Sequence, residues 1–360
     1  MEGSLAFFRF ANVFLTPQGS VDGPKVIHES RARKGRKRKK CRFLGLFRPF
    51  ETTIHRLERV LLVPSAELVP TYTTAVNTWQ CDENDHLNVQ YYTEFGHEAS
   101  AHLLHRLGIG PRAQRASGTI VSAQEDHIRY LREFRVVDAV EVRSAPVEVG
   151  AHDLAIYHEL RNAAAGTLAS TIRQRVVSSK PWPDKVRQRA EAMRVELPTQ
   201  ARPRSVSTTA MPHVRLEDAE GIGLIAAGRT VIKPDECDEH GHFLPRHQFG
   251  RYSDAAPWLW NHFGFDRGAM QARGEGTVVV ETLHSYRSTL KSGALLTIMS
   301  GLADYTDKIL KLVHYAFDTE SGTLAACSEG IGMKFDQKAR KIMTFSGEDQ
   351  ARLAALKLRF

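Results

Sequence analysis

The amino-acid sequence predicts an α+β protein that contains two copies of one unit. The segment CDENDH at residues 81–86 returns as CDEHGH at residues 237–242, 156 positions later. A helix-like segment follows each copy, and a series of short runs with alternating apolar residues follows each helix. One long helix before several strand candidates is typical of a helix packed on a largely antiparallel sheet.

The repeat keeps one register without a gap over roughly ninety positions. At the same offset Tyr130 matches Tyr286, and the segment GTLA at residues 166–169 matches GTLA at residues 322–325. Chance does not preserve one register over this length. We therefore infer an internal duplication.

Composition and the repeat together divide the chain into segments. We expect a basic, disordered extension over residues 1–65, a first unit over 70–178, a linker over 179–225, a second unit over 226–345 and a C-terminal helix over 346–360. Five prolines interrupt the linker, and Ser346 is a typical N-cap residue for the last helix.

Within each unit the helix and the strands follow from residue spacing. Between residues 89 and 107 apolar residues recur at three- and four-residue spacing, and Gly108 follows where a glycine commonly ends a helix. Apolar and β-rich runs predict strands at 73–78, before the loop, and at 119–123, 128–130, 140–142, 154–158 and 168–177 after the helix. The second unit has matching runs at 230–233, 277–281, 295–299, 309–316 and 324–335.

The positive charge is concentrated at the N-terminus. The formal net charge is +8, but residues 1–65 hold 14 Lys and Arg against five Asp and Glu, so the remainder is close to neutral. A near-neutral body has no general electrostatic footprint for nucleic acid. The basic run at residues 31–40 favours an extended segment. It is either an arm for nucleic acid or anionic lipid, or a disordered extension or translated upstream sequence.

The cysteines and the hydropathy of the sequence indicate where the protein works and what it does not bind. The four cysteines contain no Cys-x-x-Cys pair and do not resemble a secreted disulfide framework, so we expect a cytoplasmic protein. No run approaches the roughly 20 apolar residues that a membrane-spanning helix needs, so we expect no membrane partner. Cys237, His240 and His242 are close together, but the first unit offers only Cys81 and His86 in register, so we expect no metal.

The segment WQCDENDHLNVQY at residues 79–91 resembles the loop and helix start of hotdog-fold acyl-CoA thioesterases of the 4-hydroxybenzoyl-CoA thioesterase type. The segment EDHIRYLR at residues 125–132 is similar to the strand that follows the helix in that family. The resemblance is strongest to the branch associated with carnitine breakdown, whose substrate is betainyl-CoA. It covers roughly residues 70–178 and 226–340.

This resemblance implies a double hotdog, in which each long helix is wrapped by an antiparallel sheet. The two halves would pair into one continuous sheet as an intramolecular pseudo-dimer, with active sites at the seam. The sequence also departs from the family pattern. Asp85 replaces a glycine in the first loop, Leu244 replaces an asparagine after the second loop, and His247 stands where the first unit has Tyr91. The second site is therefore either silent or devoted to binding.

Asp82 and Asp238 are the candidate catalytic carboxylates. Each lies a few residues before a helix N-terminus, where free backbone N–H groups attract developing negative charge. Thioester hydrolysis needs an activated water or a carboxylate nucleophile, together with stabilisation of an oxyanion. An aspartate in this position is otherwise a helix cap.

Further candidates surround these two carboxylates. His86 and Asn88 are expected to take part in catalysis, either by polarising the carbonyl and positioning water or, alternatively, by locking the loop and capping the helix. The candidate substrate-binding residues are Tyr91, Glu98, Glu125, His242, Asp254 and Glu281. For the carboxylates among them, the alternatives are a solvated helix face and a structural hydrogen bond.

The combined prediction is an acyl-CoA thioesterase that releases free acid and CoA and needs no cofactor. Two other functions stay open: a hotdog enoyl-CoA hydratase or dehydratase, and a non-catalytic acyl-CoA-binding protein. Pseudo-dimers could associate further into a homo-oligomer. The acyl group is not predicted.

Overall fold

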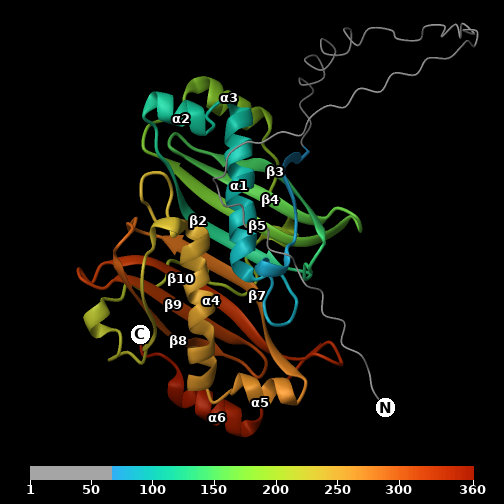
Figure 1. Cartoon of the computed structure of the whole chain (residues 1–360), viewed down its shortest axis with the longest axis vertical. Helices are drawn as coiled ribbons and strands as arrows, with labels where there is room; N and C mark the ends of the chain where they lie inside the picture. Colours follow the sequence, from blue (N-terminus) through green and yellow to red (C-terminus); the bar gives the residue numbers. More distant parts are fainter. Residues whose placement is uncertain (1–66) are drawn as a thin grey trace, which may run out of the picture. The chain divides into compact units, whose positions relative to one another are not determined.

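The computed structural model describes residues 67–360 of the chain. The predicted basic extension over residues 1–65 lies outside these residues. Within the described part, eleven strands form one antiparallel sheet in the order β1-β3-β4-β5-β2-β7-β10-β9-β8-β6, and β11 pairs with β10 (Figure 1).

The strands are β1 (Val69–Ala75), β2 (Val121–Tyr130), β3 (Ala139–Val149), β4 (Asp153–Asn162), β5 (Thr167–Ser178), β6 (Ile225–Val231), β7 (Glu275–Tyr286), β8 (Leu295–Tyr305), β9 (Leu310–Asp318), β10 (Leu324–Asp336) and β11 (Lys341–Ile342). The helices are α1 (Val89–Leu107), α2 (Pro111–Ser117), α3 (Asp184–Ala192), α4 (Pro245–His262), α5 (Arg267–Ala272) and α6 (Gly347–Leu356). Short 3₁₀ turns occupy Thr78–Gln80, Thr199–Ala201, Leu216–Asp218 and Pro234–Glu236.

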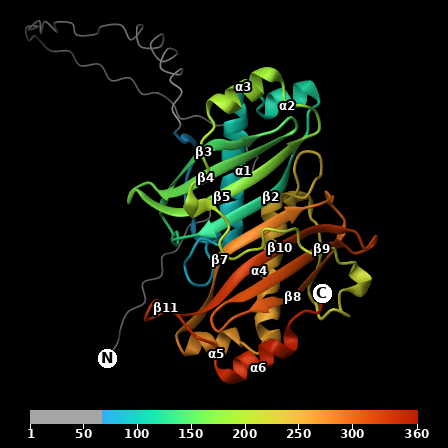
Figure 2. The same ribbon diagram turned by 180° about the vertical axis from the view of Figure 1, so that it is seen from behind.

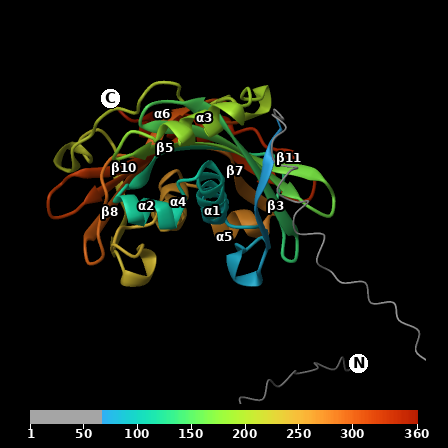
Figure 3. The ribbon, with the colours of Figure 1, turned by 90° about the horizontal axis from the view of Figure 1, so that it is seen from above.

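The predicted duplication is confirmed element by element. Moving 156 positions along the chain carries β1 onto β6, α1 onto α4, α2 onto α5, and β2 to β5 onto β7 to β10, with ends that agree within two residues. Each long helix lies on the same face of the sheet (Figure 3). This is the double hotdog that the resemblance implied, and the α+β class is confirmed.

The first strand begins earlier than predicted. The expectation was residues 73–78, whereas β1 spans Val69–Ala75 and residues 78–80 form a 3₁₀ turn. Pro70 and a register irregularity between Pro70 and Tyr72 mark the start of this strand, which lies at the edge of the sheet. Proline is tolerated at such an edge because its missing N–H does not interrupt a central ladder.

The two halves meet along a seam, by which we mean the pairing of β2 with β7 and the packing of α1 on α4. His127 lies opposite Leu283, and these two positions are themselves 156 residues apart, so a pseudo-twofold axis passes between them. On the helices, Arg246 of α4 donates to Glu94 of α1. The pseudo-symmetric contact is between Gln90 and Gly250, where an added Cβ would approach the Gln90 side chain to 2.8 Å.

Two short helices close the far ends of α1 and α4 in the same way. The Arg189 guanidinium on α3 donates to the Leu107 carbonyl at 3.2 Å, and Arg352 on α6 donates to the Phe263 carbonyl at 2.7 Å. Leu107 and Phe263 are counterparts in the repeat. A cation there satisfies a carbonyl that the last helical turn leaves free and complements the negative end of the helix dipole.

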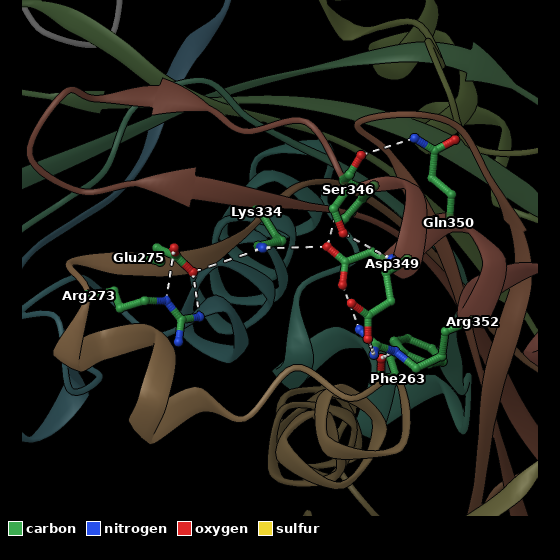
Figure 4. Close-up of polar contacts among 10 residues, drawn as sticks. Phe263, Arg273, Glu275, Lys334, Ser346, Asp349, Gln350 and Arg352 are labelled. Carbon is green, nitrogen blue, oxygen red and sulfur yellow. Dashed lines mark hydrogen bonds and ion pairs between the residues drawn. The ribbon is translucent and has the colours of Figure 1, made fainter.

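Figure 4 shows the α6 contacts. Ser346 caps this helix by accepting from the Asp349 N–H at 3.1 Å, as its residue type predicted. The Asp349 carboxylate also accepts from Arg352 at 2.5 Å. The capping residue, the carboxylate and the arginine therefore hold the last helix against the end of α4.

The linker crosses the sheet face that lies opposite the long helices (Figure 2), and Glu281 holds it there. The Glu281 carboxylate accepts from the Arg204 and Ser205 N–H groups, both at 2.8 Å, and lies 2.8 Å from His127 Nε2. Glu281 is 3% exposed. Burial alone would raise the pKa of Glu281, but the hydrogen bond from His127 and the two backbone bonds outweigh it and lower the pKa.

We predict that Glu281→Gln lowers the free energy of unfolding by about 2 kcal/mol, because buried hydrogen-bonding groups lose a charged partner. The folded-state pKa of Glu281 is below its unfolded value, so this contribution is present at neutral pH and is lost as the pH falls through the folded-state pKa. Urea unfolding at several pH values measures it, with Glu320→Gln on an exposed turn as the control. A constant difference between wild type and Glu281→Gln down to pH 3 would contradict the prediction.

Candidate functional site at the seam

The first loop, residues 81–88, is wound around the Asp82 carboxylate. Asp82 Oδ1 accepts from the Asn84 N–H at 2.8 Å and from the His86 N–H at 3.2 Å. Within residues 67–360, Asp82 Oδ2 has no hydrogen-bond partner, and the side chain is half-buried. The loop thus fixes the carboxylate through one oxygen and leaves the other oxygen available.

The second loop, residues 237–244, repeats the winding with both carboxylate oxygens engaged. Asp238 Oδ1 accepts from the His240 and His242 N–H groups at 2.8 and 2.9 Å, and Oδ2 lies 3.4 Å from His242 Nδ1. Burial would raise the pKa of Asp238, but the backbone bonds from His242 and His240 outweigh it and lower the pKa. Asp238 is therefore more fully occupied than Asp82.

The two helix starts differ as well. Asn88 caps α1, its side-chain oxygen accepting from the Gln90 N–H at 3.2 Å. In the part of the chain that the structure describes, the Val89 N–H has no acceptor and remains available to a ligand. At the start of α4, Leu244 has no polar side chain with which to cap, and Pro245 supplies no N–H.

His86 belongs to the first loop, and its ring contacts two residues that follow β2. Arg135 Nη2 lies 2.8 Å from His86 Nε2, and Glu133 Oε2 lies 3.2 Å from the same nitrogen. Glu133 also pairs with Arg340 of the second half at 2.9 Å. The His86 ring therefore ties the loop to the segment after β2.

The predicted substrate-binding residues on the helices do not converge on one point. The Tyr91 ring is buried beneath the Arg246 guanidinium, 4.7 Å from it, and so belongs to the contact between α1 and α4. Glu98 is exposed on α1. The Asp254 side chain is 72% exposed and pairs with Arg251 on its own helix at 3.7 Å.

Glu125 and Glu281 lie on the sheet face away from the long helices. Glu125 pairs with Arg173 at 3.3 Å, and Glu281 holds the linker as described above. Side chains alternate between faces along a strand, so the neighbour of Glu125, Asp126, points the other way, toward α1. The predicted strand is correct, but its polar residue beneath the helix is one position further on.

A cluster that the sequence did not predict occupies this helix side of the seam. Asp126 Oδ2 lies 2.7 Å from His97 Nε2 on α1 and accepts from the Tyr286 hydroxyl on β7 at 2.8 Å, while Asp126 Oδ1 accepts from Gln174 at 2.9 Å. We call His97, Asp126 and Tyr286 the polar cluster. It joins the two halves because Tyr286 belongs to the second.

The polar cluster keeps its carboxylate charged although Asp126 is 1% exposed. Burial alone would raise the pKa of Asp126. The charge of His97 and the hydrogen bonds from His97, Gln174 and Tyr286 together lower that pKa to about 2. The His97 side chain is 25% exposed, so it connects the buried carboxylate to the solvent side of α1.

The network continues under α1 to the far strands of the first half. Ser100 donates to Gln174 and lies 3.1 Å from His158 Nε2, and Ser144 lies 2.7 Å from His158 Nδ1. Burial lowers the pKa of His158 to about 3, so this ring is neutral. The second half keeps only the last link, in which Ser300 lies 2.7 Å from His314 Nδ1.

The polar cluster has no copy in the second half. At offset 156, Ser253 takes the place of His97 and Thr282 takes the place of Asp126, while Tyr130 matches Tyr286. His284 on β7 lies opposite Asp126 in the sheet, and the centroid of its ring is 4.1 Å from that of the Phe249 ring. Burial lowers the pKa of His284 to about 3. One feature of the sequence could have indicated the polar cluster. When the two halves are aligned, His97 and Asp126 have no charged or ionisable counterpart in the second half.

Two surface hollows lie away from both loops. One, of about 360 Å³, is lined by residues 220–225, His262 and the end of α6, and the other, of about 510 Å³, lies between β3 and the segment after α3. No set of three or more His, Cys, Asp or Glu side chains suited to a metal occurs among residues 67–360. None of the helices described is long and apolar enough to cross a bilayer.

Comparison with known proteins places this arrangement in a family. Residues 76–187 and 232–353 match the model of the Thioesterase-like superfamily, one match in each half. Together these segments make up most of the chain, and the chain belongs to that family. Both loops and both long helices lie inside the matched segments.

Among particular proteins, the chain is similar to the L-carnitine dehydrogenase/betainyl-CoA thioesterase of Agrobacterium fabrum, with 33% identity over 104 residues. That match covers 29% of this chain and spans about a fifth, 21%, of the relative. In structure the chain is similar to an acyl-ACP thioesterase from Bacteroides thetaiotaomicron (TM-score 0.56, 10% identity, 72% of this chain and 96% of that one). It is also similar to the 12:0-ACP thioesterase from Umbellularia californica (TM-score 0.54, 12% identity, 73% and 93%). At these identities the structural likeness bears on the fold alone.

We predict that Asn88→Ala lowers the free energy of unfolding by about 1 kcal/mol, because the first turn of α1 loses its side-chain acceptor. Leu244→Asn offers α4 the cap that it lacks and is expected to leave stability unchanged or raise it. Chemical unfolding followed by circular dichroism compares the two variants. Equal stability of Asn88→Ala and wild type would show that the cap contributes nothing.

Proposed function

We propose that this protein hydrolyses acyl-CoA thioesters to the free acid and CoA at the seam. Family membership supports the reaction class, and the observation that carries the proposal is Asp82. Its carboxylate is held through one oxygen, has its other oxygen available, and precedes the capped start of α1.

The chemistry at the first loop follows from these groups. Asp82 Oδ2 takes a proton from water while the water oxygen bonds to the thioester carbonyl carbon. The Val89 N–H and the positive end of α1 face the negative charge that develops on the carbonyl oxygen. When the carbon–sulfur bond breaks, Asp82 returns the proton to the sulfur of CoA.

The proposal also concerns the size of the acyl group. The similar Agrobacterium protein is named for betainyl-CoA, whose acyl group is short and cationic, and we propose a small acyl group here. A buried carboxylate, several neutral histidines and tyrosine hydroxyls beneath the helices disfavour a long alkyl chain, because their hydrogen-bonding groups would be covered by hydrocarbon.

We also propose that the protein works in a reducing compartment such as the cytoplasm. Cys81, Cys237 and Cys327 are free thiols in the described part of the chain, and the first two are partly exposed beside the two loops.

The test is release of free thiol, followed with a thiol reagent, across a panel of acyl-CoA esters from short polar to long alkyl. A hydratase would instead change the absorbance of an enoyl-CoA without releasing thiol, and a binding protein would bind without turnover. Failure to release thiol from every member of the panel would refute the proposal.

We predict that Asp82→Asn lowers kcat about 100-fold when measured at pH 5, because a positioned general base contributes 10²- to 10⁴-fold. At this pH an ordinary imidazole is protonated and cannot replace the lost base. His158 and His284, which burial keeps neutral, are 0% and 1% exposed and do not reach water. Asp85→Asn is the matched control, since Asp85 is exposed in the same loop and asparagine tolerates its positive φ of 59°. Equal kcat for Asp82→Asn and wild type at pH 5 would exclude Asp82 as the base.

A further inference from the structure

The second end of the seam carries a different candidate base. His97 lies in the row of α1 residues that faces α4, one turn beyond Glu94, whose carboxylate pairs with Arg246 in the first turn of α4. Because Gln90 meets Gly250 while Glu94 meets Arg246, the two helices run in opposite directions. Continuing along α1 from Glu94 therefore leads toward the start of α4 and the second loop.

Two further contacts place the polar cluster at this end. Tyr286 packs against the apolar cluster that contains Phe243 of the second loop and Phe249 of the first turns of α4. Glu239 in the second loop also pairs with Arg115 on α2 at 3.2 Å, so the second loop lies against the first half. The polar cluster therefore faces the second loop. By the symmetry of the repeat, its counterparts Ser253, Thr282 and Tyr130 face the first loop.

The two ends complement one another in their available bases. At the first end Asp82 has a free carboxylate oxygen, and the residue in the position of His97 is Ser253. At the second end Asp238 Oδ1 accepts two N–H groups, Asp238 Oδ2 lies 3.4 Å from His242 Nδ1, and His97 is present. Each end therefore has one unengaged base, of a different chemical type.

Asp126 fixes the form of the His97 ring. With Nε2 held 2.7 Å from an ionised carboxylate, that nitrogen carries the proton. His97 Nδ1 has no partner within residues 67–360, and in the neutral ring it bears the free lone pair. A buried carboxylate orients a histidine for proton abstraction in serine hydrolases in a similar way, although there the carboxylate binds Nδ1 and Nε2 is the base.

We propose that the second end of the seam is a second acyl-CoA hydrolysis site in which His97 is the general base, with Asp126 and Tyr286 as its positioning residues. This inference rests on the proposed function. The proton of water passes to Nδ1, the water oxygen bonds to the thioester carbonyl carbon, and the carbon–sulfur bond breaks with its electron pair on sulfur. Nδ1 then returns the proton to that sulfur.

Several titratable groups surround His97. The titratable groups around it are Asp126 on β2, His284 and Tyr286 on β7, and His158 on β4, while Arg246 on α4 is already paired with Glu94. Burial keeps His284 and His158 neutral with pKa values of about 3.

The experiment uses the full chain and the most active ester of the panel. Asp82→Asn removes the first base, and we expect its remaining thiol release to be low at pH 5 and to rise with pH as an imidazole loses its proton. Adding His97→Gln should lower this remainder at pH 8 by about 100-fold. Asp126→Asn in the same background should change the pH dependence, and Tyr286→Phe, which removes a single bond to Asp126, should change it less.

Controls separate chemistry from folding. His102→Gln changes an exposed histidine on the same helix and should leave the remainder intact. Thermal unfolding checks that each variant folds, and ¹⁵N NMR of the histidine rings tests the Nε2–H form of His97 without reference to activity. The proposal is overturned if Asp82→Asn has no thiol release at pH 8, or if His97→Gln leaves that release and its pH dependence unchanged. A wild-type protein without any thiol release would instead refute the proposed function itself.

Discussion

The pairing of β2 with β7 is the interaction on which the rest of the structure depends. Each half alone would expose this strand as an unpaired edge, which is an unstable arrangement for a sheet. Pairing joins ten strands and the short β11 into one sheet and brings the start of each long helix beside the other helix. The polar cluster takes Tyr286 from the second half and His97 and Asp126 from the first, so it exists only because this strand pair forms.

Fusion of the two copies has consequences that a symmetric dimer does not allow. In a homodimer any change appears at both ends of the interface. In this chain the ends differ at several matched positions. Ser253 is the counterpart of His97, Thr282 is the counterpart of Asp126, and Leu244 is the counterpart of Asn88. The bond between serine and histidine under each helix, at 2.7 Å in both halves, has instead been kept. We therefore regard that bond as structural and the differing positions as sites of specialisation.

Much of the fold could be predicted because the same pattern of helix and strand signals occurs in both halves of the sequence. The two loops, the long helices and most strands follow from spacing and from end signals such as Gly108, whose φ of 96° favours glycine. The loop carboxylates could also be predicted, because their motif is local. The side chains that meet across the seam could not, since their contacts join residues up to 160 positions apart.

The polar cluster lies one residue away from two carboxylates that sequence reasoning favoured. Sequence reasoning favoured Glu98 and Glu125 as substrate-binding residues, whereas the polar cluster contains His97, which precedes Glu98, and Asp126, which follows Glu125 on β2. A shift of one residue along a strand moves a side chain to the other face. A register irregularity between Ala123 and Glu125 interrupts the alternation just before this point, so counting from the apolar residues of the strand does not identify the inward face.

The buried charge of Asp126 argues for a function beyond stability. Removing a carboxylate from water costs more than its partners generally return, and replacing a buried ionic group by a neutral one is often neutral or stabilising. The chain itself contains that replacement, because Thr282 occupies the equivalent place in the second half of the same sheet, with only a 3.4 Å contact to Tyr130. The fold therefore accommodates a neutral residue at this position. The architecture does not require a carboxylate here, yet Asp126 is held by three side-chain partners, one of which is the partly exposed His97. The role of His97 is the best explanation for Asp126.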